Sequence, residues 1–191
     1  MITAILLAAG LSSRTKQLNK LLINYKKKKI IQHSVSNILS SKIDYLLVIT
    51  GRNHNKIRRY IPKKRNVKII FNKNYKLGMS TSIKKGINYL PKDTNYFFIT
   101  LADMPNIKKH HYNKMIDLIK KNKNIPIVPF YKSQQFNPVL FPMLFATKLK
   151  KLKGDTGAKK ILTKTKIKKI QFLNNSFLKD FDTLEDFSNH N

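Results

Sequence analysis

The chain alternates between short apolar runs rich in β-branched residues and longer segments in which apolar residues recur with helical spacing. Runs that are apolar at every position are typical of strands buried on both faces, as in a parallel sheet covered by helices. The alternation therefore predicts an α/β fold with a single doubly wound, mostly parallel sheet flanked by helices. The predicted strands are 2–7, 45–50, 67–71, 96–101, 126–130 and 138–141, and the predicted helices between them are 31–40, 53–60, 80–90 and 107–122.

The pattern becomes irregular in the last quarter of the chain, where it predicts two short helices at 142–151 and 156–163 and a strand near 166–172. A terminal helix is predicted to open at Asp182-Thr183-Leu184-Glu185, because an aspartate N-cap followed by a glutamate at the third helical position is close to a capping box. No internal repeat and no linker rich in Gly, Ser or Pro interrupts the chain. We therefore predict a single domain over residues 1–191.

Composition supports a globular protein and removes several classes of chemistry. Of the 191 residues, 41% are hydrophobic, which is enough for a core and excludes intrinsic disorder. The chain has no cysteine, which excludes disulfide scaffolds, thiolate zinc sites and cysteine nucleophiles.

The net charge of +30, from 39 Lys+Arg against 9 Asp+Glu, invites a nucleic-acid-binding interpretation. Only five of the 39 cations are arginine, and the chain is rich in Lys, Asn and Ile, whose codons are A/T-rich, while Ala and Gly number six each. Proteins that bind nucleic acid usually bring arginine and clustered aromatics, whereas these lysines are spread over the whole chain as on solvated faces. We therefore attribute much of the charge to genome composition, with a basic nucleic-acid-binding module as the alternative outside the enzymes.

No segment predicts a membrane span or an export signal. The longest apolar stretches, 5–9 and 45–49, are far shorter than the roughly 20 residues of a spanning helix. The apolar start of the chain has no basic residue before it, and Arg14 follows it, so a buried first strand is the better interpretation. We expect a cytoplasmic protein without a membrane partner.

The first predicted strand ends at a candidate phosphate site. In an open α/β sheet, ligands bind beyond the carboxyl ends of the strands, near the point where the strand order reverses. The small side chains of Ala8-Ala9-Gly10 let phosphate oxygens approach the backbone N–H groups, and Arg14 and Lys20 can add positive charge. The segment is neither a Gly-x-Gly-x-x-Gly motif nor a Walker loop, and an ordinary turn with surface cations is the alternative.

A second candidate site follows the apolar strand Phe97-Phe98-Ile99-Thr100-Leu101, which ends in Ala102-Asp103-Met104-Pro105. A carboxylate at this place can hold Mg²⁺ against the phosphates of a nucleotide. Asp103 is equally able to cap the helix predicted from residue 107, so the residues alone leave both roles open.

Eight motifs follow one another along nearly the whole chain: Leu7-Ala8-Ala9-Gly10 with Ser12, Arg14 and Asn19-Lys20-Leu21-Leu22; Val48-Ile49-Thr50-Gly51; Asn72 with Tyr75; Gly78-Met79-Ser80-Thr81-Ser82 with Gly86; Leu101-Ala102-Asp103-Met104-Pro105; Asn137-Pro138-Val139-Leu140-Phe141; Gly154-Asp155-Thr156-Gly157-Ala158-Lys159; and Asp180-Phe181-Asp182-Thr183-Leu184-Glu185-Asp186. In this order they resemble the MobA-like nucleotidyltransferase family, and within it most closely the molybdenum cofactor cytidylyltransferases. The resemblance implies a Rossmann-like nucleotidyltransferase fold, with a nucleotide-binding half at 1–105 and an acceptor-binding half at 106–191.

The resemblance also implies roles for individual residues. Mg²⁺ (or Mn²⁺) would bind Asp103 and Asp182, and Arg14, Lys20 and Asp103 would be the catalytic residues. The implied acceptor-binding residues are Asn137, Pro138, Gly154 and Asp155. The implied nucleotide-binding residues are Leu7, Ala8, Ala9, Gly10, Lys20, Asn72, Gly78, Ser80 and Ser82.

The implied reaction is the transfer of CMP from CTP to the terminal phosphate of molybdopterin or the molybdenum cofactor, with release of pyrophosphate. The Leu-Ala-Ala-Gly form resembles the CTP-using members, whereas GTP-using relatives tend to have Leu-Ala-Gly-Gly. The implied partners are these small molecules and, beyond them, a recipient molybdoenzyme or its maturation factor. A phosphate nucleophile is already ionised at neutral pH, so we expect no general base and no catalytic role for the five histidines.

Two departures from the family pattern bear on these assignments. Thr15-Lys16 stands where the family usually has Met-Gly, and Gln135-Phe136 stands where it tends to have Arg-Gly. The second departure is on the acceptor side, so a nucleotidyltransferase that uses GTP or another phosphorylated acceptor, such as a sugar or polyol phosphate, is the alternative within the class.

All six glycines lie at predicted junctions or within motifs, which predicts positive φ or close backbone approach at several of them.

Overall fold

The structure, a computed structural model, describes residues 1–10 and 19–172. Its strands are β1 (Ile2–Ala8), β2 (Asn24–Tyr25), β3 (Lys28–Lys29), β4 (Tyr45–Thr50), β5 (Val67–Phe71), β6 (Tyr96–Leu101), β7 (Ile127–Tyr131), β8 (Gln134–Gln135), β9 (Val139–Pro142) and β10 (Lys168–Gln171). Its α-helices are α1 (Ile30–Leu39), α2 (His54–Ile57), α3 (Met79–Asn88), α4 (Lys109–Asp117), α5 (Ala146–Lys150) and α6 (Lys159–Leu162). Short 3₁₀ helices are η2 (Lys20–Leu22), η3 (Arg58–Tyr60), η4 (Tyr75–Leu77), η5 (Ile119–Lys121) and η6 (Met143–Phe145).

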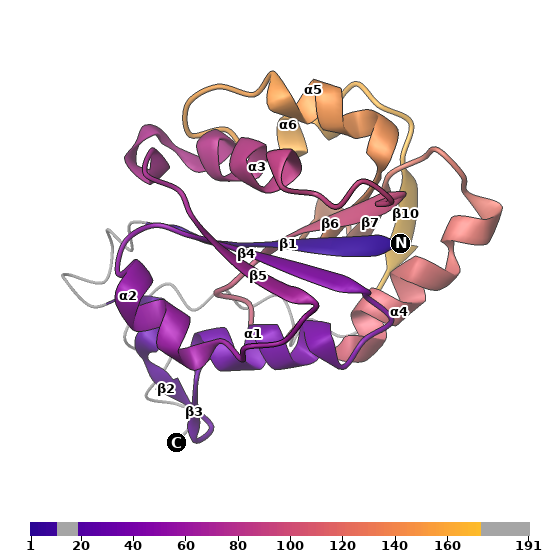
Figure 1. The fold of residues 1–191 in the computed structure, drawn as a ribbon. Coiled ribbons are helices and arrows are strands. Elements are labelled where there is room, and N and C mark those ends of the chain that lie inside the picture. Colours follow the sequence, from indigo (N-terminus) through magenta and orange to yellow (C-terminus); the bar gives the residue numbers. More distant parts are fainter. Residues whose placement is uncertain (11–18, 173–191) are drawn as a thin grey trace.

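One eight-stranded sheet lies between two layers of helices (Figure 1), and β2 and β3 pair in a separate two-stranded sheet. The order of the larger sheet is β10-β7-β9-β6-β1-β4-β5, with β8 paired to β7. The pairs of β1 with β4 and β6, of β4 with β5 and of β7 with β10 are parallel, whereas β9 runs antiparallel to both of its neighbours. α1, α2 and α4 lie on one face of the sheet, and α3, α5 and α6 lie on the other. The predicted doubly wound, mostly parallel α/β fold is therefore confirmed.

Every strand predicted between residues 2 and 172 is present, with ends within two residues of those expected. The predicted helix at 107–122 is shorter at both ends. Its start is set by the ring of His111, which accepts the N–H of Lys108 (2.9 Å), and after Asp117 the chain continues as the separate turn η5. The predicted helix at 53–60 divides into α2 and η3, and the one at 156–163 contracts to α6. The helix predicted to open at Asp182 lies outside the described residues.

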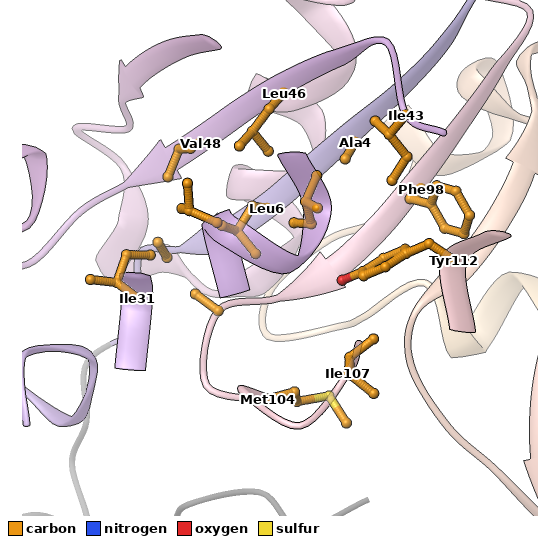
Figure 2. Close-up of a cluster of buried hydrophobic side chains, with 14 of the residues drawn as sticks. Ala4, Leu6, Ile31, Ile43, Leu46, Val48, Phe98, Met104, Ile107 and Tyr112 are labelled. Carbon is orange, nitrogen blue, oxygen red and sulfur yellow. The ribbon is translucent and has the colours of Figure 1, made fainter. Parts of the chain in front are cut away.

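The alternation of side chains along β1 divides the core into two clusters. Leu6 points to the face covered by α1 and α4 and belongs to a cluster with Phe98 and Tyr112 (Figure 2). Ile5 points to the opposite face, where Ile83 of α3 belongs to the second cluster. Successive strand residues point to opposite faces, so a strand covered on both sides is apolar at every position. This is why the central strands read as continuous apolar runs.

α3 packs directly against β1 at Gly86, where there is no space for a larger residue. A Cβ atom added to Gly86 would lie 2.4 Å from Cγ2 of Ile5. Tyr75, just before α3, and the carbonyl of Ala9, just after β1, both lie against Gly51, so the beginning of α3 lies near the carboxyl end of β1.

The order of the strands defines one switch point. The chain passes from β1 outward to β4 and β5 and then returns to β6 on the other side of β1. The carboxyl ends of β1 and β6 are consequently neighbours, and the N–H of Ala102 donates to the carbonyl of Leu7 (3.1 Å). In open α/β sheets such a point forms the ligand-binding crevice.

The described residues contain no helix with the length and hydrophobicity needed to cross a bilayer.

Candidate functional site at the switch point

An ion pair joins the two loops that leave β1 and β6. Lys20 Nζ contacts Asp103 Oδ2, and the two side chains are only 17% and 18% exposed. Charges at this depth are screened less by salt than surface charges are, while the remaining exposure leaves them within reach of a ligand. The structure thus brings together the two predicted catalytic residues that lie among its described residues.

Asn19 sets the position of Lys20. Its side-chain Oδ1 accepts the N–H of Leu21 (3.0 Å) and caps the short turn η2. Its Nδ2 donates to the carbonyl of Arg52 (3.4 Å), in the loop that follows β4. One buried asparagine therefore links the Lys20 turn to the carboxyl end of a second strand.

The loop that carries Asp103 is held from α1. Ser34 Oγ donates to the carbonyl of Ala102 (2.8 Å), and Asn37 Nδ2 donates to the carbonyl of Pro105 (3.0 Å). Sequence reasoning missed these two positioning residues. On the sequence they look like ordinary polar positions of an amphipathic helix, and nothing in their spacing indicates a role in the site.

The alternative role for Asp103, as the cap of the following helix, does not apply. Lys108 is the N-cap of α4, and the capping contact comes from His111. Burial, and next the charge of neighbouring His110, lower the pKa of His111 to about 4, so its ring is neutral near pH 7 and can accept the N–H. The carboxylate of Asp103 faces Lys20 instead.

The carboxylate of Asp103 is the metal-binding group that the described residues offer at this site. These residues contain no group of three or more His, Asp or Glu side chains placed to share a metal ion. Magnesium is commonly held by one or two carboxylates together with substrate phosphates and water, so a single partly exposed aspartate fits such an ion. Asp182, the second predicted ligand, and Arg14 lie outside the described residues, as does Thr15-Lys16.

The predicted phosphate loop begins within the sheet and then leaves it. Ala8 and Ala9 are buried, whereas Gly10 is exposed. Gly51 packs against this loop and against Tyr75, since a Cβ at position 51 would lie 2.9 Å from the carbonyl oxygen of Ala9 and 2.6 Å from Tyr75 Cγ. A Cβ at Gly10 would meet nothing within 4 Å, so packing within the described protein does not require glycine there.

Asn72 uses its side chain to hold the beginning of α3. Its Nδ2 donates to Thr81 Oγ1 (2.9 Å) and Ser82 Oγ (3.0 Å), and its Oδ1 accepts the N–H of Asn74 (3.2 Å). Both amide hydrogens of this buried residue are thus committed inside the protein. The amide of Asn72 therefore positions the beginning of α3.

Ser80 and Ser82, both predicted to bind the nucleotide, point in different directions. Residues two positions apart on a helix do not face the same side. Ser82 turns toward Asn72, whereas Ser80 is 1% exposed and its Oγ is the buried side-chain polar atom without a hydrogen-bond partner among the described residues.

The predicted acceptor-binding residues lie in two places. The Asn137–Pro138 peptide bond is cis and immediately precedes β9, whose antiparallel pairing sets Val139 opposite Ile99. Asn137 therefore lies at the same edge of the sheet as Asp103. Gly154 and Asp155 lie elsewhere, against the first turn of α3 beside Gly78, and so contact a segment predicted to bind the nucleotide.

A histidine stands at the carboxyl end of β4, close to this site. His54 Nδ1 lies 2.7 Å from Thr50 Oγ1, which also donates to the carbonyl of Ile70 (3.2 Å). Burial, and next the charge of Arg58, lower the pKa of His54. Its contact with Thr50 links the start of α2 to the end of β4.

The profile of the MobA-like NTP transferase domain matches residues 4–170. The chain belongs to this family. It is a nucleotidyltransferase, as its motif order indicated. Its glycines at positions 51, 78 and 86 allow close packing among the loops, α3 and β1.

Two curated relatives match this MobA-like chain over nearly its full length. It is 25% identical to the molybdenum cofactor cytidylyltransferase of Escherichia coli (strain K12), over 97% of this chain and 93% of the relative. It is also 25% identical to the purine catabolism protein PucB of Bacillus subtilis (strain 168), over 97% of this chain and 94% of the relative.

The fold is shared with a solved structure from Mycobacterium tuberculosis H37Rv. The crystal structure of Rv0371c is 19% identical to the chain and superposes with a TM-score of 0.85, over 98% of this chain and 96% of that one. The structure of Rv0371c in complex with manganese superposes with a TM-score of 0.80. These similarities confirm the Rossmann-like fold that the resemblance implied.

Proposed function

We propose that the protein transfers CMP from CTP to the phosphate of molybdopterin or the molybdenum cofactor and releases pyrophosphate. The observation that carries the proposal is the Lys20–Asp103 pair at the switch point, where a lysine and a carboxylate meet beside the Leu7–Gly10 segment. The Leu-Ala-Ala-Gly form and the 25% identity to the Escherichia coli cytidylyltransferase support cytosine as the base.

The charged residues of the site fit a triphosphate and a divalent ion. Asp103, with Asp182 as the second ligand, would hold Mg²⁺ (or Mn²⁺), which when bound neutralises charge on the triphosphate. Lys20 and Arg14 would bind the β- and γ-phosphates, and the backbone N–H groups of Ala8-Ala9-Gly10 would contact the phosphate oxygens.

The proposed chemistry is an in-line displacement at the α-phosphorus. An oxygen of the acceptor phosphate forms a bond to this phosphorus, the bond to the oxygen bridging to the β-phosphate breaks, and pyrophosphate leaves with the electron pair. The acceptor oxygen is already ionised, so no side chain has to remove a proton. Holding the two phosphates in line and neutralising the charge on the leaving group supply most of the catalysis.

The acceptor would lie along Asn137 and Pro138, at the edge of the sheet that carries Asp103. Two observations favour a second candidate class of acceptor, a phosphorylated molecule other than molybdopterin. The chain has the same 25% identity to a Bacillus subtilis protein of purine catabolism as to the cytidylyltransferase, and Gln135-Phe136 departs from the family pattern on the acceptor side. Transfer to another phosphorylated acceptor, or from GTP, is therefore tested together with the first proposal.

The decisive experiment is a substrate panel with purified full-length protein. CTP, GTP and ATP are each supplied with Mg²⁺ and molybdopterin, and the release of pyrophosphate is measured. We expect CTP to be used at least about tenfold faster than GTP, because a site that hydrogen-bonds one base leaves its polar groups unpaired with another.

Three results would overturn parts of the proposal. Release with GTP alone would overturn the assignment of the base, and release with CTP only when a sugar or polyol phosphate replaces molybdopterin would overturn the acceptor. No release with any nucleotide, together with DNA or RNA binding that weakens steeply with salt, would favour the nucleic-acid-binding alternative.

A further inference from the structure

A loop from the acceptor half lies on the first turn of α3. Figure 1 shows the connection between α5 and α6 reaching toward the beginning of α3. There the N–H of Met79 donates to Asp155 Oδ1 (3.0 Å), and the N–H of Ser80 donates to the carbonyl of Gly154 (3.3 Å). Two of the N–H groups that a helix leaves unpaired at its beginning are thus satisfied from a segment more than 70 residues away.

The packing at this contact requires a glycine. Gly78 has φ of +104°, and a Cβ there would lie 2.4 Å from the carbonyl carbon of Gly154 and 2.5 Å from the nitrogen of Asp155. A Cβ at Gly157 would lie 3.1 Å from Met79 Sδ. The loop and the start of α3 are therefore in direct backbone contact, with no space for a side chain between them.

α3 contains no cap of its own. Its N-cap residue is Gly78, which has no side chain to accept a hydrogen bond, and its first turn contains no acidic residue. The carboxylate of Asp155 supplies both missing elements, because it accepts an N–H and places a negative charge near the positive end of the helix dipole.

The other side of the same turn is held by the nucleotide half. Asn72 donates to Thr81 and Ser82, which follow directly after the residues that Asp155 and Gly154 contact. The beginning of α3 is therefore held between an anchor from each half of the chain. Removal of either anchor leaves only one side of the turn supported.

We infer that Asp155 is a positioning residue for the nucleotide: it caps α3 and thereby makes the nucleotide site depend on a segment of the acceptor half. The inference rests on the proposed function, and it replaces direct acceptor binding as the role of this carboxylate. A ligand binds less tightly when only a fraction of the protein holds the binding-competent conformation. Loss of the cap therefore weakens nucleotide binding even in the absence of any acceptor.

The test compares Asp155→Ala and Asp155→Asn with a matched control, Asp44→Ala. Asp44 Oδ2 also accepts a backbone N–H from a distant segment, that of Ile2 (2.6 Å), at the opposite edge of the sheet. Each alanine variant loses one carboxylate and one such hydrogen bond, so their effects on net charge are equal. The dissociation constants of CTP, GTP and ATP are measured for the full-length proteins with Mg²⁺ and without acceptor.

We expect Asp155→Ala to raise the dissociation constant of the preferred nucleotide about fivefold, which is the effect of losing one helix cap. The dissociation constant of Asp44→Ala should stay within about twofold of that of the unchanged protein. Asparagine caps helices nearly as well as aspartate, so Asp155→Asn should restore binding to within about twofold. Hydrogen exchange at the amides of Met79 and Ser80 should also be faster in Asp155→Ala, in the absence of any ligand.

The results separate this inference from the proposed function. If Asp155→Ala binds nucleotide as tightly as Asp44→Ala, or raises only the KM of the acceptor, or leaves exchange at α3 unchanged, the positioning role is overturned. If the unchanged protein binds a nucleotide and the variants behave as expected while no CMP is transferred, the inference stands and the proposed reaction fails. Absence of binding to all three nucleotides would overturn both.

Discussion

Two lysine–aspartate pairs in this protein consist of the same residue types in opposite settings. Lys20 and Asp103 meet at the carboxyl edge of the sheet, with less than a fifth of each side chain exposed. Lys42 Nζ and Asp117 Oδ1 lie 2.7 Å apart between the start of β4 and the end of α4, with more than half of each side chain exposed. Exposed pairs contribute about 0–1 kcal/mol to stability and are screened by salt. In a chain with 39 cations and 9 acids, the location in the fold therefore distinguishes the proposed functional pair from a surface pair.

The largest expected effect is that of neutralising Asp103, with the same change at Asp117 as the control. Asp103→Asn should lower kcat/KM for nucleotide transfer by about 100-fold or more, the usual cost of removing one group that stabilises transition-state charge. Asp117→Asn should leave kcat/KM within about twofold, because its partner remains solvated. Pyrophosphate release and thermal unfolding of both variants provide the measurement. Equal losses of activity in the two variants would remove the distinction between the pairs.

A second prediction compares two glycines of the same site. Gly78→Ala should destabilise the protein by about 2–3 kcal/mol, because alanine is strained at positive φ and its Cβ would overlap the Gly154 backbone. Gly10→Ala should leave stability within about 0.5 kcal/mol, because the added atom meets nothing within 4 Å. The same change should raise the KM of the nucleotide if phosphates approach that backbone. Urea unfolding and steady-state kinetics measure the two effects. A stability loss at Gly10 as large as that at Gly78 would contradict the packing described for this loop.

The smallest effect concerns the far end of the Asp103 loop, where His111 caps α4. The folded pKa of His111, about 4, lies below the value of about 6.5 in an unfolded chain, so folding releases a proton from this residue at intermediate pH. Its contribution is therefore complete above pH 6.5 and is lost as the pH falls from 6.5 toward 4. After allowance for solvent screening, we expect a loss on the order of 1–2 kcal/mol between pH 7.5 and pH 4.5.

Urea unfolding at several pH values measures this loss. His111→Gln should reduce the dependence of stability on pH, whereas His110→Gln, on the exposed neighbouring residue, should change it less. An unchanged pH dependence in His111→Gln would show that the cap does not require the neutral ring.

The strands could be predicted because a strand that is buried on both faces of a sheet is apolar at every position. β4, β5 and β6 have the predicted bounds, since each is a continuous apolar run between polar segments. The β2–β3 hairpin was not predicted, because its turn places Lys26 and Lys27 at positive φ, where Asn or Gly would be the usual signal. The start of α4 was also missed, because the cap is a histidine ring rather than a common capping side chain.

The candidate site was predictable in part for the same reason. Asp103 stands directly after a buried strand, and Leu7–Gly10 ends another, so their place at the carboxyl edge follows from the strand pattern. The roles of Ser34 and Asn37 had no sequence signal. Each donates to a backbone carbonyl almost 70 residues away, and such a contact depends only on how α1 lies against the sheet.

The fold class, the family and the identity of the chemical groups follow from the sequence alone, because they depend on local hydrophobic pattern and on the order of short motifs. Which of these groups meet depends on the tertiary structure. β6 returns beside β1, which joins Lys20 to Asp103, and the loop after α5 folds onto α3, which turns Asp155 from an expected acceptor contact into a helix cap. Both contacts connect segments far apart along the chain, and their formation depends on strand order and layer packing, which no local pattern encodes.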